Sequence, residues 1–381
     1  MVDKPLVRAR LVAQGMCPAP GGRRSSFETP EAVATGLGAL QGQDLPGALS
    51  SVALRVMHAG SGVEASVALE RTREAFSRGR LVRGYPMRGT VFVTSAEDLW
   101  WMTELCAGPA VKQARKNSPR LGIEDEHFSV ARGVLERECA GPEGATRAQV
   151  FEAWAAAGVP TEGGCSYHLL KHFLSTMFVT YGPLTEDGPV ENRVVLSSEW
   201  LPDGSRLAVA FNDDRQAATA ELLRRYVLSR GPVTLRDFQW WTKLPLTLIR
   251  AAARDIESSV EEWGTDESGD ALLCAPDLPE VVAQVGRVTD RPQLLPPFDE
   301  MILGYPDRTY IVPAEHHATL VPGNNGVFRS AVVAGSQVVG YWRRKGQKGK
   351  RSLVLEPFGV MSEARENKVR AVFEQYPHAN A

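Results

Sequence analysis

The 381-residue sequence lacks the features that mark membrane, secreted and metal-binding proteins. Its five cysteines are scattered, odd in number and without a CxxC pair, so neither a disulfide framework nor a zinc or iron–sulfur site is indicated. No apolar run approaches the length that crosses a bilayer, and the N-terminus lacks a signal-peptide stretch. We therefore expect a cytoplasmic protein with no bound cofactor, no metal and no membrane partner.

Lysine is also scarce, since only nine of the 43 basic residues are lysine. The net charge of −2 argues mildly against a protein that binds nucleic acid through bulk electrostatics. A local basic patch is sufficient for such binding, because counterion release depends on the phosphates contacted and not on total charge. The excess of arginine suits bidentate phosphate contacts. High-GC coding produces the same excess, and we favour that explanation.

The seven histidines form no HExxH motif. His168 and His172 stand four residues apart on an expected helix, which is the spacing of two metal ligands on one face. The sequence offers them no nearby carboxylate partner. We interpret both as helix-surface residues or as hydrogen-bonded core residues.

The chain repeats a pattern of two or three helices followed by two short strands, which describes a winged helix. In the first copy, Thr29 caps a helix that ends near Gln41, and a strand–turn–strand follows at 81–93. The second copy ends in a strand pair within 177–196, and the third in one within 260–274. Threonine caps with core aromatic residues one and two turns later recur in the second and third copies.

From Leu294 onward the sequence is rich in short β runs, including 311–312 and 327–333, with a final helix at 363–376. A chain of this length predicts two to four compact units. We predict an α+β fold of three tandem winged-helix units and a C-terminal antiparallel β domain. The expected boundaries are 1–125, 126–205, 206–286 and 287–381.

Four stretches, in this order along nearly the whole chain, resemble one known family. They are Ala39-Leu40-Gln41-Gly42-Gln43, Met87-Arg88-Gly89-Thr90-Val91-Phe92, Leu294-Leu295-Pro296-Pro297-Phe298-Asp299-Glu300 and Val338-Val339-Gly340-Tyr341-Trp342. Together they are similar to the AlkZ-like winged-helix DNA glycosylases, whose characterised members include self-resistance enzymes of bacteria that make DNA-alkylating antibiotics. The resemblance implies a concave channel for duplex DNA.

The resemblance also implies that Gln41 and Gln43 are catalytic. The family signature is Gln, an apolar residue, then Gln or Asp, and these two glutamines occupy its outer positions. Two positions depart from the family pattern. Gly42 replaces the bulky apolar residue, and Phe92 stands where many relatives carry His.

An amide is a very poor base, so the two glutamines cannot deprotonate water as a carboxylate or imidazole would. They can orient a water molecule and offer carbonyl oxygens to a cationic sugar. This suffices when the leaving base is already cationic, as in an N7- or N3-alkylated purine. We therefore expect a monomeric, monofunctional DNA glycosylase that acts on alkylated duplex DNA, including antibiotic adducts or crosslinks, and leaves an abasic site.

Other positions carry weaker expectations. For Gln41 and Gln43 the alternative is that they cap a helix end and bond the neighbouring backbone. We expect Arg88 to pair with Asp98, and Asp299 to cap a turn or pair with Arg308. The candidate DNA contacts are the basic run Arg343-Arg344-Lys345 with Lys348, Lys350 and Arg351, and the groove-probing residues His316, His317, Asn324 and Asn325.

Two other functions remain open at this point. The first is a winged-helix transcription regulator without catalytic activity. Against it, the helix at 246–254 is mostly apolar, whereas a sequence reader needs Arg, Asn and Gln on its recognition helix. The second is a resistance protein that sequesters the drug itself.

Overall fold

The computed structural model describes residues 2–18, 27–59, 62–185, 190–322, 326–346 and 350–379. The chain divides into two compact units. The first comprises Met1–Thr72, Ala220–Trp241 and Pro245–Ala381, and the second comprises Arg73–Thr219 and Thr242–Leu244. The chain passes between the units within α4 (Ala65–Ser77) and α12 (Arg215–Arg230), at the last residue of α13 (Leu235–Thr242), and again after Leu244. The four-part division by repeat stays a prediction.

Helices of the first unit begin where the sequence supplies caps. The Thr29 hydroxyl accepts a hydrogen bond from the Ala32 N–H at the start of α2 (Pro30–Leu37), and the Asp44 carboxylate accepts one from the Gly47 N–H at the start of α3 (Leu45–His58). Further helices of this unit are α1 (Lys4–Ala13), α13 (Leu235–Thr242), α14 (Leu246–Asp255), α15 (Leu278–Val285), α16 (Glu300–Leu303), α17 (His317–Leu320) and α18 (Glu363–Glu374).

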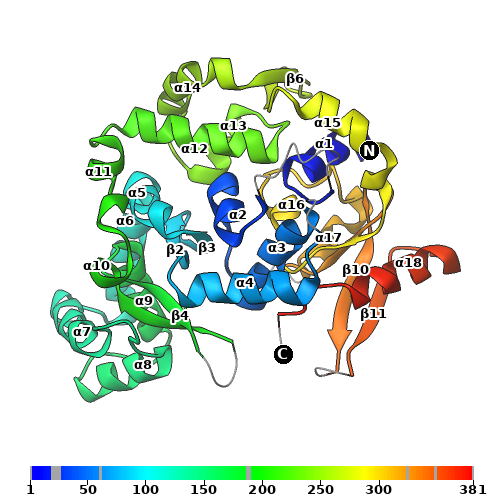
Figure 1. Ribbon diagram of the computed structural model, residues 1–381. Coiled ribbons are helices and arrows are strands. Elements are labelled where there is room, and N and C mark those ends of the chain that lie inside the picture. The colour runs from blue at the N-terminus through cyan, green and yellow to red at the C-terminus, as the bar shows by residue number, and fades with distance from the viewer. Residues whose placement is uncertain are drawn as a thin grey trace. The chain divides into compact units, whose positions relative to one another are not determined.

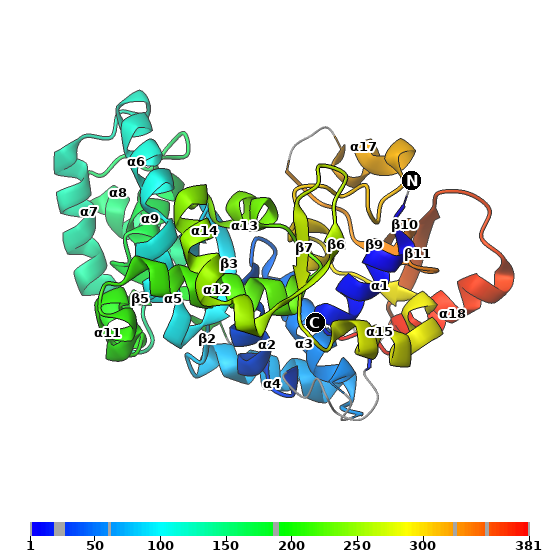
Figure 2. The same ribbon diagram turned by 90° about the horizontal axis from the view of Figure 1, so that it is seen from above.

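An antiparallel four-stranded sheet in the order β11-β10-β9-β8 forms the C-terminal part of the first unit (Figures 1 and 2). Its strands are β8 (Gln293–Leu294), β9 (Ala331–Val333), β10 (Val338–Lys345) and β11 (Ser352–Pro357). The prediction of a strand at 311–312 is wrong. The Ile311 and Val312 N–H groups both donate to the Arg308 carbonyl in a tight turn. The strand expected at 327–333 pairs only from Ala331.

The same unit contains an antiparallel hairpin of β6 (Glu261–Thr265) and β7 (Ala271–Cys274), where the third strand pair was predicted. Two of the aromatic residues predicted to be core after Thr234, Phe238 and Trp241, are fully buried. Tyr226 packs against both rings, with centroids 5.3 and 5.0 Å away. This part of the repeat therefore has the expected apolar interior.

In the second unit the strands lie in the order β3-β2-β4-β5, and each neighbouring pair is antiparallel. The strands are β2 (Leu81–Met87), β3 (Thr90–Ser95), β4 (Val179–Leu184) and β5 (Asn192–Leu196), which confirms the two predicted strand pairs. Its helices include α5 (Ala96–Cys106), α6 (Gly108–Asn117), α7 (Asp125–Glu138), α8 (Arg147–Ala156), α9 (Cys165–Ser175), α10 (Ser197–Trp200) and α11 (Leu207–Phe211).

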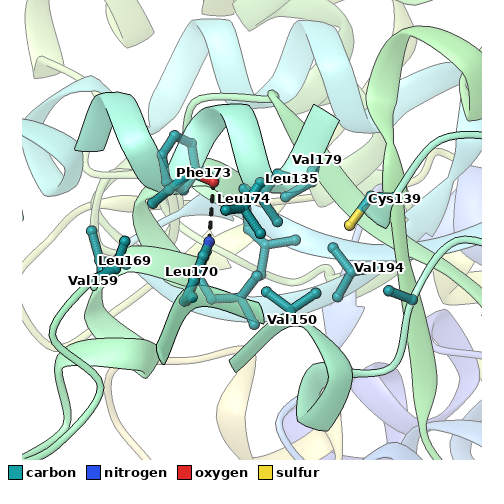
Figure 3. Close-up of a cluster of buried hydrophobic side chains, with 14 of the residues drawn as sticks. Leu135, Cys139, Val150, Val159, Leu169, Leu170, Phe173, Leu174, Val179 and Val194 are labelled. Atoms are coloured by element: carbon teal, nitrogen blue, oxygen red, sulfur yellow. Dashed lines mark hydrogen bonds between the residues drawn. The ribbon is translucent and has the colours of Figure 1, made fainter. Parts of the chain in front are cut away.

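The core of the second unit is formed by α7, α8 and α9 with β4 and β5. Figure 3 shows Leu135, Val150 and Val194 converging there from α7, α8 and β5. Trp154 is fully buried, and its indole N–H donates to the Ala131 carbonyl at 3.0 Å. Of the two aromatic residues predicted to be core in the second repeat, Trp154 is fully buried, and Phe151 is half-buried and packs against the same cluster.

These units confirm the predicted mixture of helices with antiparallel strands. Among the described residues, no helix combines the length and apolar character needed to cross a bilayer.

Candidate functional site

The Gln-Gly-Gln triplet links a short strand to a helix. Helix α2 ends at Leu37 with Gly38 as its C-cap, four residues before Gln41, so the predicted helix end was too late. β1 (Leu40–Gln41) follows. Helix α3 then begins immediately after Asp44, its N-cap. The triplet thus occupies the loop that enters the N-terminus of a 14-residue helix.

The side-chain amides of Gln41 and Gln43 are not held by hydrogen bonds from the described residues. Gln41 is 8% exposed, whereas Gln43 is exposed. Within the described parts of the chain, neither side-chain amide takes part in a hydrogen bond. The alternative in which these amides cap a helix end is therefore not realised there. The two amides keep their donors and acceptors for another partner.

The backbone of Gln41 is held by a buried ion pair. The Gln41 N–H donates to Oε1 of Glu300 at 2.8 Å. Oε2 of Glu300 accepts from Nη2 and Nε of Arg230, at 2.9 and 3.2 Å. The side chains of this Glu300–Arg230 pair are 1% and 0% exposed. The guanidinium also donates to the carbonyls of Leu37 and Ala39, at 2.5 Å each.

A second buried ion pair joins α3 to α16. Asp299 accepts from Arg55 at 3.1 and 3.2 Å and from the Ser51 hydroxyl at 2.7 Å. It also caps α16 by accepting from the Met301 N–H at 2.9 Å. Capping by Asp299 was predicted, but its cation is Arg55 and not Arg308. Arg308 instead lies over the Phe328 ring.

A chain of hydrogen bonds connects the two pairs. Gln14 accepts from Arg55 through its side-chain oxygen at 2.9 Å and donates to the Tyr305 hydroxyl at 2.9 Å. That hydroxyl in turn donates to the Arg230 carbonyl at 2.9 Å. Two acids and two arginines therefore share one satisfied network, which is the condition under which buried charges are tolerated.

The charges of this network also affect protonation. Burial alone would raise the pKa of Asp299, but the Arg55 charge with the hydrogen bonds from Arg55, Ser51 and Met301 holds it below its usual range. Burial, followed by the Arg55 charge, lowers the pKa of His58 to about 4. At neutral pH Asp299 is therefore ionised and the His58 imidazole is neutral.

The basic run predicted to contact DNA lies on β10 and in the segment just before β11. Arg343 and Lys345 are exposed and Arg344 is half-buried. Arg343 Nε lies 3.4 Å from a Glu356 oxygen, a weak contact for a side chain that is 63% exposed. Lys350 is exposed and Arg351 half-buried, and Lys348 lies outside the described residues. Phosphate contact by this run stays a prediction.

Of the predicted groove-probing residues, His316 ends the short 3-10 turn Ala314–His316, and His317 begins α17. The His316 ring stacks on Phe358 with centroids 3.8 Å apart, so it has a packing role. Asn324 and Asn325 lie outside the described residues. Groove probing by these four residues stays a prediction.

The Met87-to-Phe92 motif belongs to the second unit and forms a two-residue hairpin turn. Arg88 and Gly89 both have positive φ, at 57° and 69°, and Met87 pairs with Thr90 across the turn. Such turns favour glycine and match strand twist, which explains the motif structurally. Asp98 accepts from Ser95 and Trp101. Its predicted pairing with Arg88 stays a prediction.

Histidines of α9 have structural partners. His168 Nε2 lies 2.9 Å from the Ser118 hydroxyl, and His172 meets the Phe128 ring edge-on at 4.7 Å. The described residues contain no group of three or more side chains placed to hold a metal ion.

Sequence reasoning missed Glu300, Arg230, Arg55 and Gln14. One signal was present, because two adjacent acids close the Pro-Pro-Phe-Asp-Glu motif and neither has a basic neighbour in sequence. Their arginines lie 244 and 70 residues away, and no local pattern links such distant positions.

Comparison with known proteins gives a family. The family model described as DNA glycosylase AlkZ-like matches residues 34–378. Among solved structures, the Streptomyces sahachiroi DNA glycosylase AlkZ is similar, with a TM-score of 0.69 and 18% identity over 100% of this chain and 97% of that chain. No curated protein matches the chain. At this identity the structural likeness establishes the fold.

Proposed function

The chain belongs to the AlkZ-like family of DNA glycosylases, and we propose that Gln41 and Gln43 together hold the water that hydrolyses a cationic alkylated purine from DNA. DNA is the substrate of the family. One observation supports the assignment above others. The two amides flank a single glycine, make no hydrogen bond within the described chain, and follow a backbone fixed by the Glu300–Arg230 pair.

The chemistry restricts the substrate. A glutamine accepts hydrogen bonds from water but does not take a proton from it at neutral pH. Hydrolysis then depends on a leaving base that needs no acid, and a purine alkylated on N7 or N3 already carries a positive charge. The amide oxygens stabilise the oxocarbenium-like sugar as it forms and aim the water at it. Uracil and neutral oxidised bases are not substrates on this proposal.

We propose that hydrolysis is monofunctional and yields an abasic site without strand cleavage. A bifunctional enzyme needs an amine nucleophile for a Schiff base. The chain has nine lysines, and none is close to the triplet in sequence. The natural substrates are bulky antibiotic adducts or crosslinks, and the enzyme protects a producing cell from its own DNA-alkylating product.

The exposed basic residues Arg343 and Lys345 supply phosphate contacts in this proposal. They alternate along β10, so both project from one face of the strand. A variant that neutralises one phosphate fewer shows a salt dependence of DNA binding that is smaller by about one unit in log–log slope. Replacing both residues with alanine therefore weakens DNA binding without changing the rate at saturating DNA.

The deciding experiment measures released base from duplex oligonucleotides that carry N7-methylguanine, a bulky N7 adduct or uracil. We expect release from one or both cationic lesions and none from uracil. Failure to release either cationic base would overturn the proposed activity. Release of uracil at a similar rate would overturn the argument that amides restrict the substrate.

Two accompanying assays separate the remaining alternatives. Borohydride should trap no covalent complex with DNA, because no amine attacks the sugar. Equilibrium binding of the free alkylating compound without DNA tests sequestration, and we expect no such binding at concentrations that saturate adducted DNA.

Gln284→Ala serves as a matched control for the glutamine variants, because it removes an exposed amide elsewhere in the first unit.

A further inference from the structure

We propose that Glu300 is a positioning residue for Gln41 and that Arg230 acts through it. This inference rests on the proposed function of Gln41. Within the described residues Glu300 makes no hydrogen bond to the side-chain amide of Gln41 or to Gln43, so its influence on the reaction passes through the Gln41 backbone. The two carboxylate oxygens of Glu300 have different partners, since Oε1 accepts from the Gln41 N–H and Oε2 accepts from the Arg230 guanidinium.

The pair spans the turn from α2 into β1, which is the segment that precedes the triplet. Leu37 is the last residue of α2, and Gly38 turns the chain with a φ of 72°. Arg230 donates to the carbonyls of Leu37 and Ala39, and Glu300 accepts from the N–H of Gln41. Donors and acceptors of two side chains therefore satisfy positions 37, 39 and 41 in succession.

The buried Glu300–Arg230 pair holds the backbone before the triplet more rigidly than exposed loop contacts would. Both partners are fully buried, and the Arg230 guanidinium lies 4.6 Å from the centre of the Trp241 ring. Its hydrogen bonds to Glu300 and to the two carbonyls fix the planar guanidinium in one orientation. The direction of the Cα–Cβ bond of Gln41 follows from the backbone held in this way.

The glycine between the two glutamines makes such a support necessary. Gly42 has more backbone freedom than any other residue could have at that position. Two side chains that must share one water need a spacing held to a fraction of an ångström. On the N-terminal side of Gly42 the Glu300–Arg230 pair fixes the chain, and on the other side the Asp44 cap starts α3.

The neighbouring Asp299–Arg55 pair provides a matched comparison. It is as deeply buried, and it shares the Gln14–Tyr305 chain of hydrogen bonds. Its bonds run to α3, α16 and Gln14, and within the described residues none reaches a backbone atom of positions 37 to 43. A purely structural role for buried acids predicts equal effects of the two pairs on the rate. A positioning role predicts different effects.

The test shortens or lengthens each acid by one methylene. Glu300→Asp keeps the charge but withdraws the carboxylate from Gln41, and Asp299→Glu is its control. Single-turnover release of N7-methylguanine is measured with the folded fraction determined in parallel. We expect Glu300→Asp to lower the single-turnover rate constant at saturating enzyme, here called kcat, by about 10- to 100-fold, the loss typical of an ångström-scale misplacement. The half-saturating enzyme concentration should change little. Asp299→Glu should leave kcat unchanged.

A second background distinguishes positioning from general damage. In Gln41→Ala, Glu300→Asp should cause no further loss of kcat, because Glu300 acts through Gln41. An equal fold loss in both backgrounds, or an unchanged kcat for folded Glu300→Asp, overturns the proposal. If Gln41→Ala itself retains the native rate, the proposed function of Gln41 fails first, and the two failures are thereby told apart.

Arg230→Lys provides a milder variant where Glu300→Asp folds poorly. It keeps the positive charge but cannot bond Glu300, Leu37 and Ala39 together, since an ammonium lacks the planar arrangement of donors. We expect a loss of kcat in the same direction, again absent in the Gln41→Ala background. An unchanged kcat for folded Arg230→Lys counts against the proposal.

Discussion

The two compact units are stabilised by different interiors. Around the triplet, the first unit buries two arginine–carboxylate pairs and the Gln14 side chain in one network. The α7–α9 core of the second unit is built from aliphatic and aromatic side chains such as Leu135 and Trp154. Replacing buried ion pairs with apolar residues is often neutral or stabilising in proteins. The charges of the first unit are therefore best explained by the backbone they hold in place.

The largest expected effect comes from breaking one of those pairs. Arg55→Met leaves the Asp299 carboxylate buried without its cation, and we expect the free energy of unfolding to fall by about 3–5 kcal/mol. Urea denaturation measures it. In the second unit, Leu135→Ala should cost about 2–4 kcal/mol through the cavity it leaves. If the stability of Arg55→Met stays close to that of the native protein, the first unit does not depend on its buried ion pair, and the comparison of the two interiors fails.

Acid should loosen the first unit through His58. Burial and the Arg55 charge lower the pKa of His58 to about 4 in the folded protein, below the ordinary value of 6.5. The folded state therefore binds the proton less readily than the unfolded chain. Stability is fully present above pH 6.5 and is lost as the pH falls from 6.5 towards 4.

Substituting His58→Phe should remove about 2 kcal/mol of that acid-dependent loss, a value reduced for the partial exposure of the ring. Urea denaturation of both proteins at pH 7, 5.5 and 4.5 measures the difference. His172 is the counterpart in the second unit, where burial lowers its pKa to about 4 as well. Parallel stability curves for native protein and His58→Phe would contradict the assignment.

The smallest expected effect on stability comes from removing one helix cap in each unit. Asp44→Ala removes the cap of α3, and Thr146→Ala removes the cap of α8. Each should cost about 1 kcal/mol of stability. Asp44 directly follows Gln43, so only its variant should slow base release. Thermal unfolding and single-turnover release, measured on both variants, test this, and an equal effect on release by both would contradict it.

Local features of the fold were predictable because their causes are local. Thr29 caps α2 and Thr146 caps α8 with a reciprocal bond to Gln149, as hydroxyl caps do throughout proteins. The three predicted strand pairs form antiparallel hairpins. The β run at 311–312 failed because apolar residues in a tight turn have the same composition as a short strand.

The candidate site was predictable only in part. The triplet was found through its resemblance to a family, and the chemistry of amides then limited the substrate. The supporting pairs were not found, because Glu300 and Arg230 meet through tertiary structure that leaves no periodic signal. The pairing of Asp299 with Arg55, in place of Arg308, has the same cause, since nearness in sequence does not determine which cation a buried acid meets.

The proposed function requires the Gln41 and Gln43 amides to act at the sugar, and the rate of base release without them decides whether they do. Single-turnover release of N7-methylguanine from duplex DNA is compared for the native protein, Gln284→Ala and the double variant Gln41→Ala/Gln43→Ala. The account predicts a fall of roughly 10²- to 10³-fold or more in the double variant, with an unchanged melting temperature, because the two amides bond nothing in the described chain. Release at the native rate by the folded double variant would contradict it.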